Sequence, residues 1–252
     1  MEPERSFIIP VLDDSPHSPW SILTLLEELE AEEGEVICII NSREMLDRLA
    51  DHPRIDKYCF NSLNPGVGRS WNQGIALAEG RVLHILNADL HLERGSVREL
   101  ELWLETLPRA VMVGPEGSDL RFESGSLAMA RRHRAEELDG PRLVDNVSGF
   151  LMVIHRARFE EAGLSFDTRY TPCFMEEWDI GFQIARAGLG AYVVPVTGYG
   201  HEWGISHERG QRIRWFRRSA SREEVLKGNG ERLKEKWFDR LPALVRGEEA
   251  RG

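Results

Sequence analysis

Short, continuous apolar runs recur along the first half of the chain, and stretches with helical spacing separate them. The runs lie at Phe7–Leu12, Val36–Ile40, Val82–Leu86 and Val111–Val113. An uninterrupted run such as Val36–Ile40 is typical of a strand that is buried on both of its faces. Strands of this kind that alternate with helices predict an α/β fold with a mainly parallel sheet.

Local signals predict where the helices between these runs begin. Ser18 with Pro19 predicts the first helix start, and two capping-box pairs predict two more. These pairs are Ser70 with Gln73 and Ser96 with Glu99. Further expected elements, by residue number, are helices at 43–51 and 175–187 and strands at 55–60, 149–154 and 191–194.

Two stretches lack the alternating pattern. Residues 116–145 are polar, charged and without a clear period, so we expect an excursion or a mobile loop there. From Arg209 onward the pattern predicts helix, with many arginines and lysines.

The overall charge and the cysteines exclude several classes of protein. A formal net charge of −10 argues against a nucleic-acid binder, because phosphate backbones require a basic face. Cys38, Cys59 and Cys173 lie far apart, which is typical of reduced thiols in a cytosolic protein. The N-terminal apolar run is too short for a signal peptide, and no stretch approaches the ~20 apolar residues of a membrane span. We therefore expect a cytoplasmic protein.

Polar residues follow a buried strand at Asn87-Ala88-Asp89, and a turn-rich loop lies at residues 61–68. Ligands of parallel α/β sheets bind beyond the carboxyl ends of the strands. A carboxylate at this place suits Mg²⁺ or Mn²⁺, which take hard oxygen ligands together with substrate phosphates. The alternative is an ordinary turn, since Asn and Asp are favoured in turns.

Carboxylates also cluster at Glu176, Glu177 and Asp179. Mutual repulsion would raise the pKa of at least one of them and suit it to base catalysis. The alternative is a set of acidic residues in the first turn of a helix, where the helix dipole favours them. His201 is either structural or a nitrogen ligand that completes a metal site built on Asp89, and its spacing to His207 excludes the zincin motif.

Other nucleotide and hydrolase motifs are missing from the sequence. Trp71 stands where a dinucleotide-binding loop that begins at Gly66 would need its third glycine. Neither the P-loop pattern nor the G-x-S-x-G nucleophile elbow occurs. A nucleotidyltransferase would want a basic glycine-rich loop after the first strand, and Asp13 and Asp14 stand there instead.

Taken in order, the short motifs of the chain resemble glycosyltransferase family 2, especially its bacterial rhamnosyltransferase-like branch, from about Ser6 to about Ser206. In chain order the motifs are Phe7–Val11; Asn64, Gly66, Gly68, Asn72 and Gly74; Ala78-Glu79-Gly80; Leu86–Asp89; Val113-Gly114-Pro115; Val147–Phe150; Phe166-Asp167; Phe174–Asp179; Ala187-Gly188; Val194-Pro195; and His201, Gly204 and Ser206.

The resemblance implies an A-type glycosyltransferase fold. Residues 1–206 would form the catalytic domain, with a nucleotide-binding half at 1–115 and an acceptor-binding half at 116–206, and residues 207–252 a helical extension. The implied activity is inverting, metal-dependent transfer of a sugar from a dTDP- or UDP-linked donor, with rhamnose as the favoured sugar. The acceptor would be a hydroxyl of a saccharide or of a lipid-linked molecule, in cell-surface polysaccharide or glycoconjugate synthesis.

The resemblance also assigns residues. Asp89 and His201 would bind Mn²⁺ or Mg²⁺, and Glu177 would be the base, with Glu176 and Asp179 as alternatives. Residues implied to bind the nucleotide sugar are Pro10, Asp13, Asn41, Gly68, Asn72, Asn87, Ala88, Asp89, Ser148 and Gly149.

At four of the family's motif positions the chain has a different residue: Asn41, Asn87 and Glu177 replace aspartates, and Gln183 replaces an arginine. The changes at Asn41 and Glu177 also fit a rival function, a nucleotide-sugar-binding module that kept the fold without the activity.

Arginines alternate with large apolar side chains between Arg209 and Arg218. Basic residues beside aromatic ones suit an anionic membrane surface, at the inner face of the membrane, or the diphosphate of a lipid-linked acceptor. The alternative is a helix that packs Ile213, Trp215 and Phe216 on the core and leaves its arginines in water.

Overall fold

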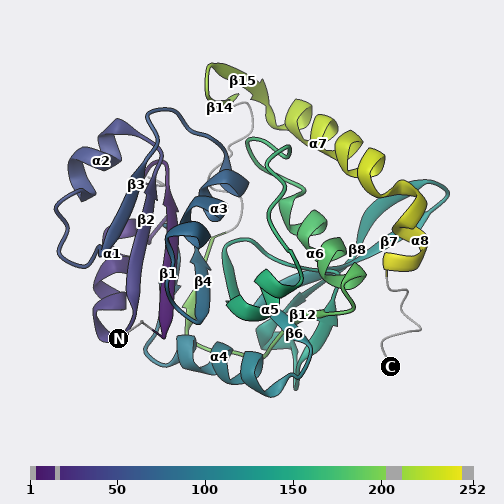
Figure 1. Cartoon of the computed structure of the whole chain (residues 1–252), viewed down its shortest axis with the longest axis horizontal. Helices are drawn as coiled ribbons and strands as arrows, with labels where there is room; N and C mark the ends of the chain where they lie inside the picture. Colours follow the sequence, from purple (N-terminus) through teal and green to yellow (C-terminus); the bar gives the residue numbers. More distant parts are fainter. Residues whose placement is uncertain (1–3, 15–17, 203–211, 246–252) are drawn as a thin grey trace.

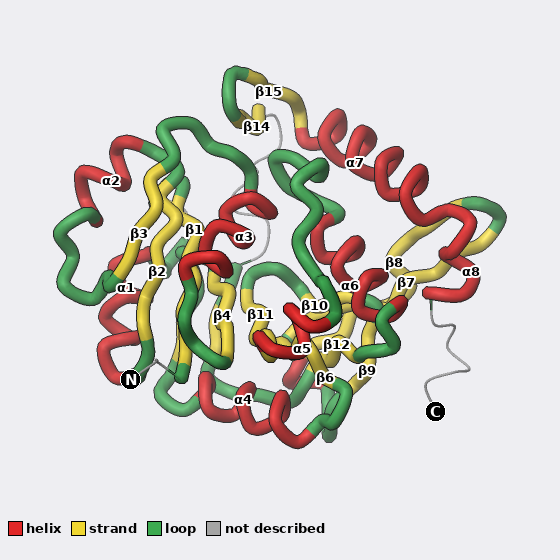
Figure 2. The backbone as a smooth tube through the Cα atoms, viewed as in Figure 1, coloured by secondary structure: helices red, strands yellow, loops and turns green. Residues whose placement is uncertain are grey.

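The computed structural model describes residues 4–14, 18–202 and 212–245. Its centre is an eight-stranded sheet with the order β3-β2-β1-β4-β11-β6-β12-β9 (Figures 1 and 2). Six strands run parallel and two, β11 and β9, run antiparallel to them, which confirms the predicted mainly parallel sheet. The bounds are β1 (Arg5–Val11), β2 (Glu35–Ile40), β3 (Lys57–Phe60), β4 (Val82–Leu86), β6 (Ala110–Gly114), β9 (Arg142–Val144), β11 (Leu151–His155) and β12 (Gly190–Val193).

Helices cover both faces of the sheet, so its central strands are mainly apolar and buried. Alternate β1 side chains point to opposite faces. Phe7 and Ile9 therefore pack in one cluster with α1, α2 and α4, whereas Ile8 packs in the other with α3, α5 and α6. The helices are α1 (Ile22–Glu28), α2 (Arg43–Leu49), α3 (Val67–Leu77), α4 (Ser96–Thr106), α5 (Arg156–Glu161) and α6 (Glu176–Arg186).

The predicted helix starts are wrong at three places. α1 begins at Ile22 and is capped by Ser21, not by Ser18. α3 and α4 each begin directly after a glycine with positive φ, Gly66 at +92° and Gly95 at +101°. A glycine takes this backbone conformation without steric cost, so it turns the chain into the helix earlier than the capping-box pattern suggests.

Most of residues 116–145 form strands, so a mobile loop is wrong, whereas the alternative of an excursion fits the hairpin found there. β7 (Glu116–Glu123) and β8 (Ser126–Arg134) make a hairpin that β10 (Asn146–Val147) extends on the other edge. Several buried residues of this sheet are polar and satisfy one another. His133 Nε2 lies 3.0 Å from Asp119 Oδ2, and Asn146 Nδ2 donates to Ser118 Oγ at 2.7 Å. Polar residues inside a sheet remove the apolar alternation by which strands are recognised.

The arginine-rich segment is a hairpin rather than a helix. β14 (Arg212–Trp215) pairs with β15 (Arg218–Ser221), and α7 (Arg222–Trp237) follows, with Ser221 and Glu224 as its capping box. Over only four residues, the alternation of arginine with Ile213 and Trp215 does not distinguish a strand from one face of a helix, which explains the error. Arg209 itself lies outside the described residues, as do Gly204 and Ser206 of the last motif.

The C-terminal helices pack on the far end of the molecule from α1 (Figure 1). Leu233 and Trp237 of α7 and Leu241 of α8 (Leu241–Leu244) form a third core cluster with Tyr170 and Phe182. A short two-stranded sheet, β5 (His91–Leu92) with β13 (Tyr199–Gly200), lies near the end of β4. In the described part of the chain, no helix combines the length and the apolar character that crossing a bilayer requires.

Candidate active site

The carboxyl ends of three parallel strands meet at one edge of the sheet. Asp13 follows β1, Asn41 follows β2, and Asn87-Ala88-Asp89 follows β4. The start of β11 lies at the same edge because Leu151 pairs with Leu86, and the Asn87 backbone N–H donates to the Phe150 carbonyl at 2.8 Å. A cavity of about 360 Å³ opens there.

Most of the residues expected in the site line this cavity. They come from four strand ends, from the N-terminus of α6 and from the segment that follows β13. The expected residues among the lining are Pro10, Asp13, Asn41, Asn87, Ala88, Asp89, Gly149, Glu176, Glu177 and His201.

Four expected residues do not line the cavity. Gly68 lies behind it, where a Cβ would stand 3.4 Å from Glu176 Cγ. Asn72 donates to the Phe166 carbonyl at 2.7 Å and accepts from the Phe166 N–H at 3.2 Å. The Ser148 N–H donates to the Glu116 carbonyl at 2.8 Å. These three residues hold neighbouring segments in place. Asp179, the fourth, is treated below.

Asp89 and His201 meet inside the cavity, although 112 positions separate them in sequence. Asp89 Oδ1 lies 3.6 Å from His201 Nε2, and Asn87 Nδ2 lies 3.2 Å from the same nitrogen. Two atoms bound to one Mg²⁺, each about 2.1 Å from the ion, can be at most about 4.2 Å apart. Both atoms can therefore contact one ion without a large movement.

The surroundings of His201 keep its imidazole neutral. Burial, aided by the charge of Arg132, lowers the pKa of His201 to about 4. The ring stacks on Phe150, with centroids 4.4 Å apart and planes 5° from parallel. Neutral imidazole is the form that binds metal ions. A His201 that stays neutral at physiological pH is thus suited to be a ligand.

The protein supplies only part of a coordination shell. Within the described residues, no group of three or more histidine, cysteine or acidic side chains could hold a metal ion. Mg²⁺ and Mn²⁺ commonly take one or two protein ligands and complete their shell with substrate phosphates and water. The pair of Asp89 and His201 fits an ion of this kind, which arrives with a diphosphate.

Glu177 lies across the cavity at the start of α6. A Cβ on Gly149 would stand 2.7 Å from Glu177 Oε1 and 2.8 Å from the Trp71 ring, so only glycine fits at this position. Burial raises the pKa of Glu177, and a hydrogen bond from the Gly149 N–H partly offsets this. The carboxylate is thus held in one place with increased basicity, as a general base requires.

Glu176 is more deeply buried than its neighbour, with 1 % of its surface exposed. Neither of its carboxylate oxygens has a hydrogen-bond partner among the described residues. Burial, followed by the charge of Glu177, raises the pKa of Glu176 well above its ordinary value. Glu176 therefore keeps its proton to a higher pH than an exposed glutamate does.

Glu176→Gln should stabilise the protein more as the pH rises. In the unfolded chain the Glu176 carboxyl ionises near its ordinary pKa of 4.5, whereas the folded protein retains the proton. The stability that Glu176 contributes is thus complete below that pKa and is lost as the pH rises towards the folded-state pKa. Glutamine has no such loss. We expect the unfolding free energy of Glu176→Gln, relative to that of the wild type, to be larger at pH 8 than near pH 4, because only the wild type loses stability over this range. Urea titrations at both pH values measure this, and a constant difference would contradict it.

Asp179 points away from the cavity and anchors the C-terminal helices. It accepts hydrogen bonds from Tyr170 Oη at 3.1 Å, Gln183 Nε2 at 2.7 Å and Trp237 Nε1 at 2.6 Å. Lys236 Nζ lies 2.8 Å from Asp179 Oδ1. A carboxylate with these partners and no exposed surface is poorly placed to take a proton from a substrate.

The turn that leads into α6 has an unusual backbone. Phe174 and Met175 have φ values of +75° and +79°, which residues other than glycine rarely adopt. Asn229 of α7 holds this turn, since its Nδ2 donates to the carbonyls of Cys173 at 2.8 Å and Phe174 at 3.1 Å. Strain of this kind persists only where the surroundings hold it, and it is commonest at functional sites.

Several lining residues could not be found from the sequence. Trp71 is buried against the cavity, and its indole N–H, which has almost no accessible surface, has no hydrogen-bond partner in the described part of the chain. Ile213 of β14 and Arg222 of α7 also line the cavity, from the segment expected to be a separate extension. Only the glycine-rich motif around Trp71 could have pointed to it.

Solved structures with the same fold include glycosyltransferases with bound nucleotides. GalNAc-T7 with UDP, GalNAc and Mn²⁺ has a TM-score of 0.70 and 16 % identity, over 94 % of this chain and 49 % of the other. The mannosyltransferase PcManGT from Pyrobaculum calidifontis, with GDP-Man and Mn²⁺, has a TM-score of 0.53 and 18 % identity, over 81 % and 59 %. TarS 1–349 of S. aureus with UDP-GlcNAc has a TM-score of 0.56 and 11 % identity, over 81 % and 61 %.

These similarities show that the chain has the A-type glycosyltransferase fold, and the chain spans about half to three fifths of the length of these structures. No curated protein matches the chain in sequence. The family model described as "Glycosyl transferase family 2" matches residues 6–161, more than half of the chain. The chain therefore belongs to glycosyl transferase family 2.

Proposed function

We propose that this chain is a metal-dependent, inverting glycosyltransferase that moves a sugar from a nucleoside diphosphate onto a hydroxyl group. The observation that carries the proposal is that one cavity has a metal-suited pair, Asp89 and His201, on one side and two carboxyl groups, Glu176 and Glu177, on the other. Family membership and the bound nucleotides of the similar structures support it.

Asp89 and His201 would hold Mn²⁺ or Mg²⁺, which supplies charge neutralisation for the departing diphosphate. Asn87 Nδ2, which lies beside His201 Nε2, would give up this contact when the ion binds, because that nitrogen has a single lone pair. Asp13 follows β1, the neighbour of β4, and Asn41 follows β2, the next strand beyond β1; both are proposed to contact the nucleoside. The Asn41 side chain is fixed there, since it donates to Ser70 Oγ at 3.0 Å and accepts from Asn61 Nδ2 at 2.9 Å.

Glu177 is proposed to take the proton of the acceptor hydroxyl as that oxygen attacks the anomeric carbon. Attack from the side opposite the diphosphate, in a single displacement, inverts the anomeric centre. Glu176, which keeps its proton, adds no second negative charge near the attacking oxygen. Trp71 is proposed to form part of the wall of the donor site, since it lines the same cavity.

The proposed donors are UDP- and dTDP-sugars, with rhamnose as the favoured sugar, and the proposed acceptors are saccharides or lipid-linked molecules of cell-surface synthesis. Residues 1–115 would bind the nucleotide and residues 116–206 the acceptor. We place the reaction in the cytoplasm, at the inner face of the membrane.

Donor binding should stabilise the folded protein only when metal is present. With Mn²⁺, UDP or dTDP at 100 times its Kd contributes about 2.7 kcal/mol. For a chain of this size that raises Tm by about 5–10 °C. GDP and ADP at the same concentration should give smaller shifts, and all four should give none in excess chelator. A thermal-shift panel measures this, and equal shifts with and without chelator would refute the metal role.

A further inference from the structure

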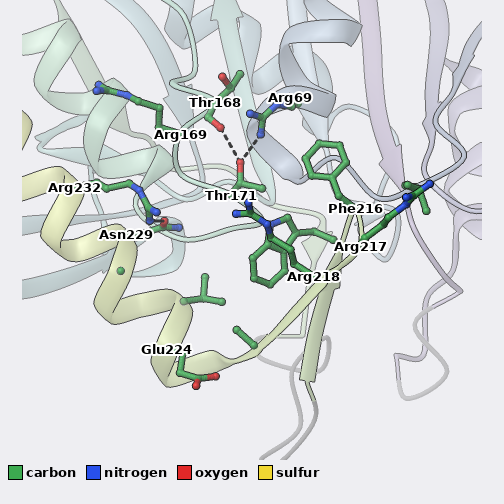
Figure 3. Close-up of a pocket in the computed structure, with 15 residues that line it drawn as sticks. Arg69, Thr168, Arg169, Thr171, Phe216, Arg217, Arg218, Glu224, Asn229 and Arg232 are labelled. Atoms are coloured by element: carbon green, nitrogen blue, oxygen red, sulfur yellow. Dashed lines mark hydrogen bonds between the residues drawn. The ribbon is translucent and has the colours of Figure 1, made fainter.

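A second and larger cavity, of about 700 Å³, lies beside the one described above. The hairpin β14–β15, the first half of α7, the start of α3 and the segment at residues 168–171 surround it (Figure 3). Five arginines line it, whereas Glu224 is the single acidic residue in its lining. In a protein with a net charge of −10, such a concentration of positive charge calls for an anionic ligand.

Most of this positive charge is not neutralised within the described residues. The Glu224 carboxylate is engaged in helix capping, since it accepts the Ser221 N–H at 2.7 Å. Figure 3 shows it at the start of α7, away from Arg232. Arg232 donates to the neutral Asn229 Oδ1 at 3.0 Å. No carboxylate of the described chain forms an ion pair with Arg218 or Arg232, whereas Arg169 pairs with Asp167.

One of the arginines is held in a fixed position. Arg69 donates to Thr171 Oγ1, which in turn donates to the Thr168 carbonyl at 2.7 Å (Figure 3). The Arg69 guanidinium also lies over the Phe216 ring, 5.5 Å from its centroid. A guanidinium that is already held in place before an anion arrives loses less conformational entropy on binding it, which favours binding.

The hairpin itself is attached to the loop before α3. The Phe216 N–H donates to the Asn64 carbonyl at 2.9 Å, and Asn64 Nδ2 donates to the Arg214 carbonyl at 2.9 Å. The backbone that carries Arg218 is therefore held against the rest of the site by two hydrogen bonds, rather than being a free arm.

The two cavities share their walls. Four pairs of close neighbours in sequence are divided between them, with the first of each pair in the arginine-lined cavity and the second in the proposed donor cavity. The pairs are Leu63 with Asn64, Thr171 with Pro172, Trp215 with Ile213, and Glu224 with Arg222. A molecule bound between the arginines can thus extend towards Glu177.

We propose that the arginine-lined cavity binds a phosphate or diphosphate group of the acceptor, so that the acceptor substrate is a phosphorylated molecule. Guanidinium groups bind phosphate oxygens through paired, charge-assisted hydrogen bonds. The Trp215 and Phe216 side chains add apolar surface beside the anion, which suits a group attached to the phosphate. Assigning the anion to the acceptor rests on the proposed glycosyltransferase function, whereas the anion site itself does not.

The test is binding of inorganic pyrophosphate to the full chain in excess chelator, where the metal-dependent donor site is inactive. Calorimetry would compare the wild type with Arg218→Gln/Arg232→Gln, which alters two opposite walls. The control, Arg121→Gln/Arg131→Gln, removes the same charge from exposed positions of the β7–β8 hairpin. We expect at least about tenfold weaker binding in the first variant and less than a twofold change in the control, because charge-assisted contacts are lost only there.

Two further measurements separate the outcomes. UDP binding with Mn²⁺ should be the same in all three proteins. If the wild type does not bind UDP with Mn²⁺, the proposed function is refuted, but the anion site still stands. Farnesyl diphosphate distinguishes the source: tighter binding than pyrophosphate indicates a lipid-linked acceptor, and equal binding a soluble one.

Equal pyrophosphate affinity in the wild type and Arg218→Gln/Arg232→Gln would overturn the proposal, as would the same loss in the control. A wild type that ignores pyrophosphate but pellets with phosphatidylglycerol vesicles, and not with phosphatidylcholine vesicles, would overturn it in favour of a membrane surface.

Discussion

Glu177→Gln should lower kcat by about 10²–10⁴-fold, the usual contribution of a general base. Glutamine has nearly the same shape, so α6 and the contact with Gly149 should persist, and UDP affinity with Mn²⁺ should change little. The wild-type kcat/KM should fall on the acidic side of a pKa raised above 4.5, since burial raises the pKa of Glu177 and only the ionised form takes a proton. Steady-state rates over pH 4–9 measure both effects.

The matched control is Glu161→Gln, an exposed carboxyl at the end of α5, which should leave kcat unchanged. Glu176→Gln should retain most of the activity, because the proton that it carries already makes this side chain neutral. A large loss in Glu176→Gln with full activity in Glu177→Gln would reverse the two roles.

Asp89→Asn should weaken Mn²⁺-dependent UDP binding by at least about 100-fold. Changes to residues that merely orient metal ligands cost about 10–100-fold in metal affinity, and a direct ligand should cost at least as much. The amide also leaves His201 as the only remaining member of the proposed pair. Calorimetric titration of UDP with and without Mn²⁺ measures the effect.

Thermal unfolding without ligand provides the control for Asp89→Asn, because a side chain at a strand end contributes little to the core and Tm should change little. Asp139→Asn, at an exposed loop position, should bind UDP as the wild type does. If Asp89→Asn retained Mn²⁺-dependent UDP affinity, Asp89 would not be a metal ligand.

The central sheet could be predicted because its strands are buried on both faces. Runs such as Val36–Ile40, fully buried in the structure, have no other plausible place in a globular protein. The sheet in turn predicted which residues share an edge. Asp13, Asn41 and Asp89 lie together for that reason, although no short-range pattern connects them.

The sheet at β7–β8 and the hairpin at β14–β15 could not be predicted, for two physical reasons. In the sheet at β7–β8, buried polar side chains such as Asp119 and His133 satisfy each other, so the strands lack apolar alternation. In the second, arginines on an exposed hairpin resemble those of an amphipathic helix over so few residues. The arginine-lined cavity forms only when this hairpin meets α3 and α7, a juxtaposition that the sequence does not encode locally.

The base could be predicted only as one of three carboxyl groups. Asp179 differs from Glu177 through its contacts with Tyr170 and with Trp237 of α7, which lies 58 positions after Asp179. Glu176 differs through burial alone. Spacing within one helical turn carries neither kind of information; the resemblance favours Glu177 and leaves the other two open, and these contacts support the same proposal.

The most direct test of the proposed function is to measure the release of nucleoside diphosphate from UDP- and dTDP-sugars by the purified chain. The measurement is made with Mn²⁺ and again in excess chelator. We predict turnover of at least one donor. This turnover should require Mn²⁺, be lost in Asp89→Asn and Glu177→Gln, and persist in Asp139→Asn. Turnover that continues unchanged in excess chelator would contradict the metal site. Metal-dependent binding of a donor that is never turned over, in the presence of phosphorylated and unphosphorylated acceptors, would instead make the chain a binding module.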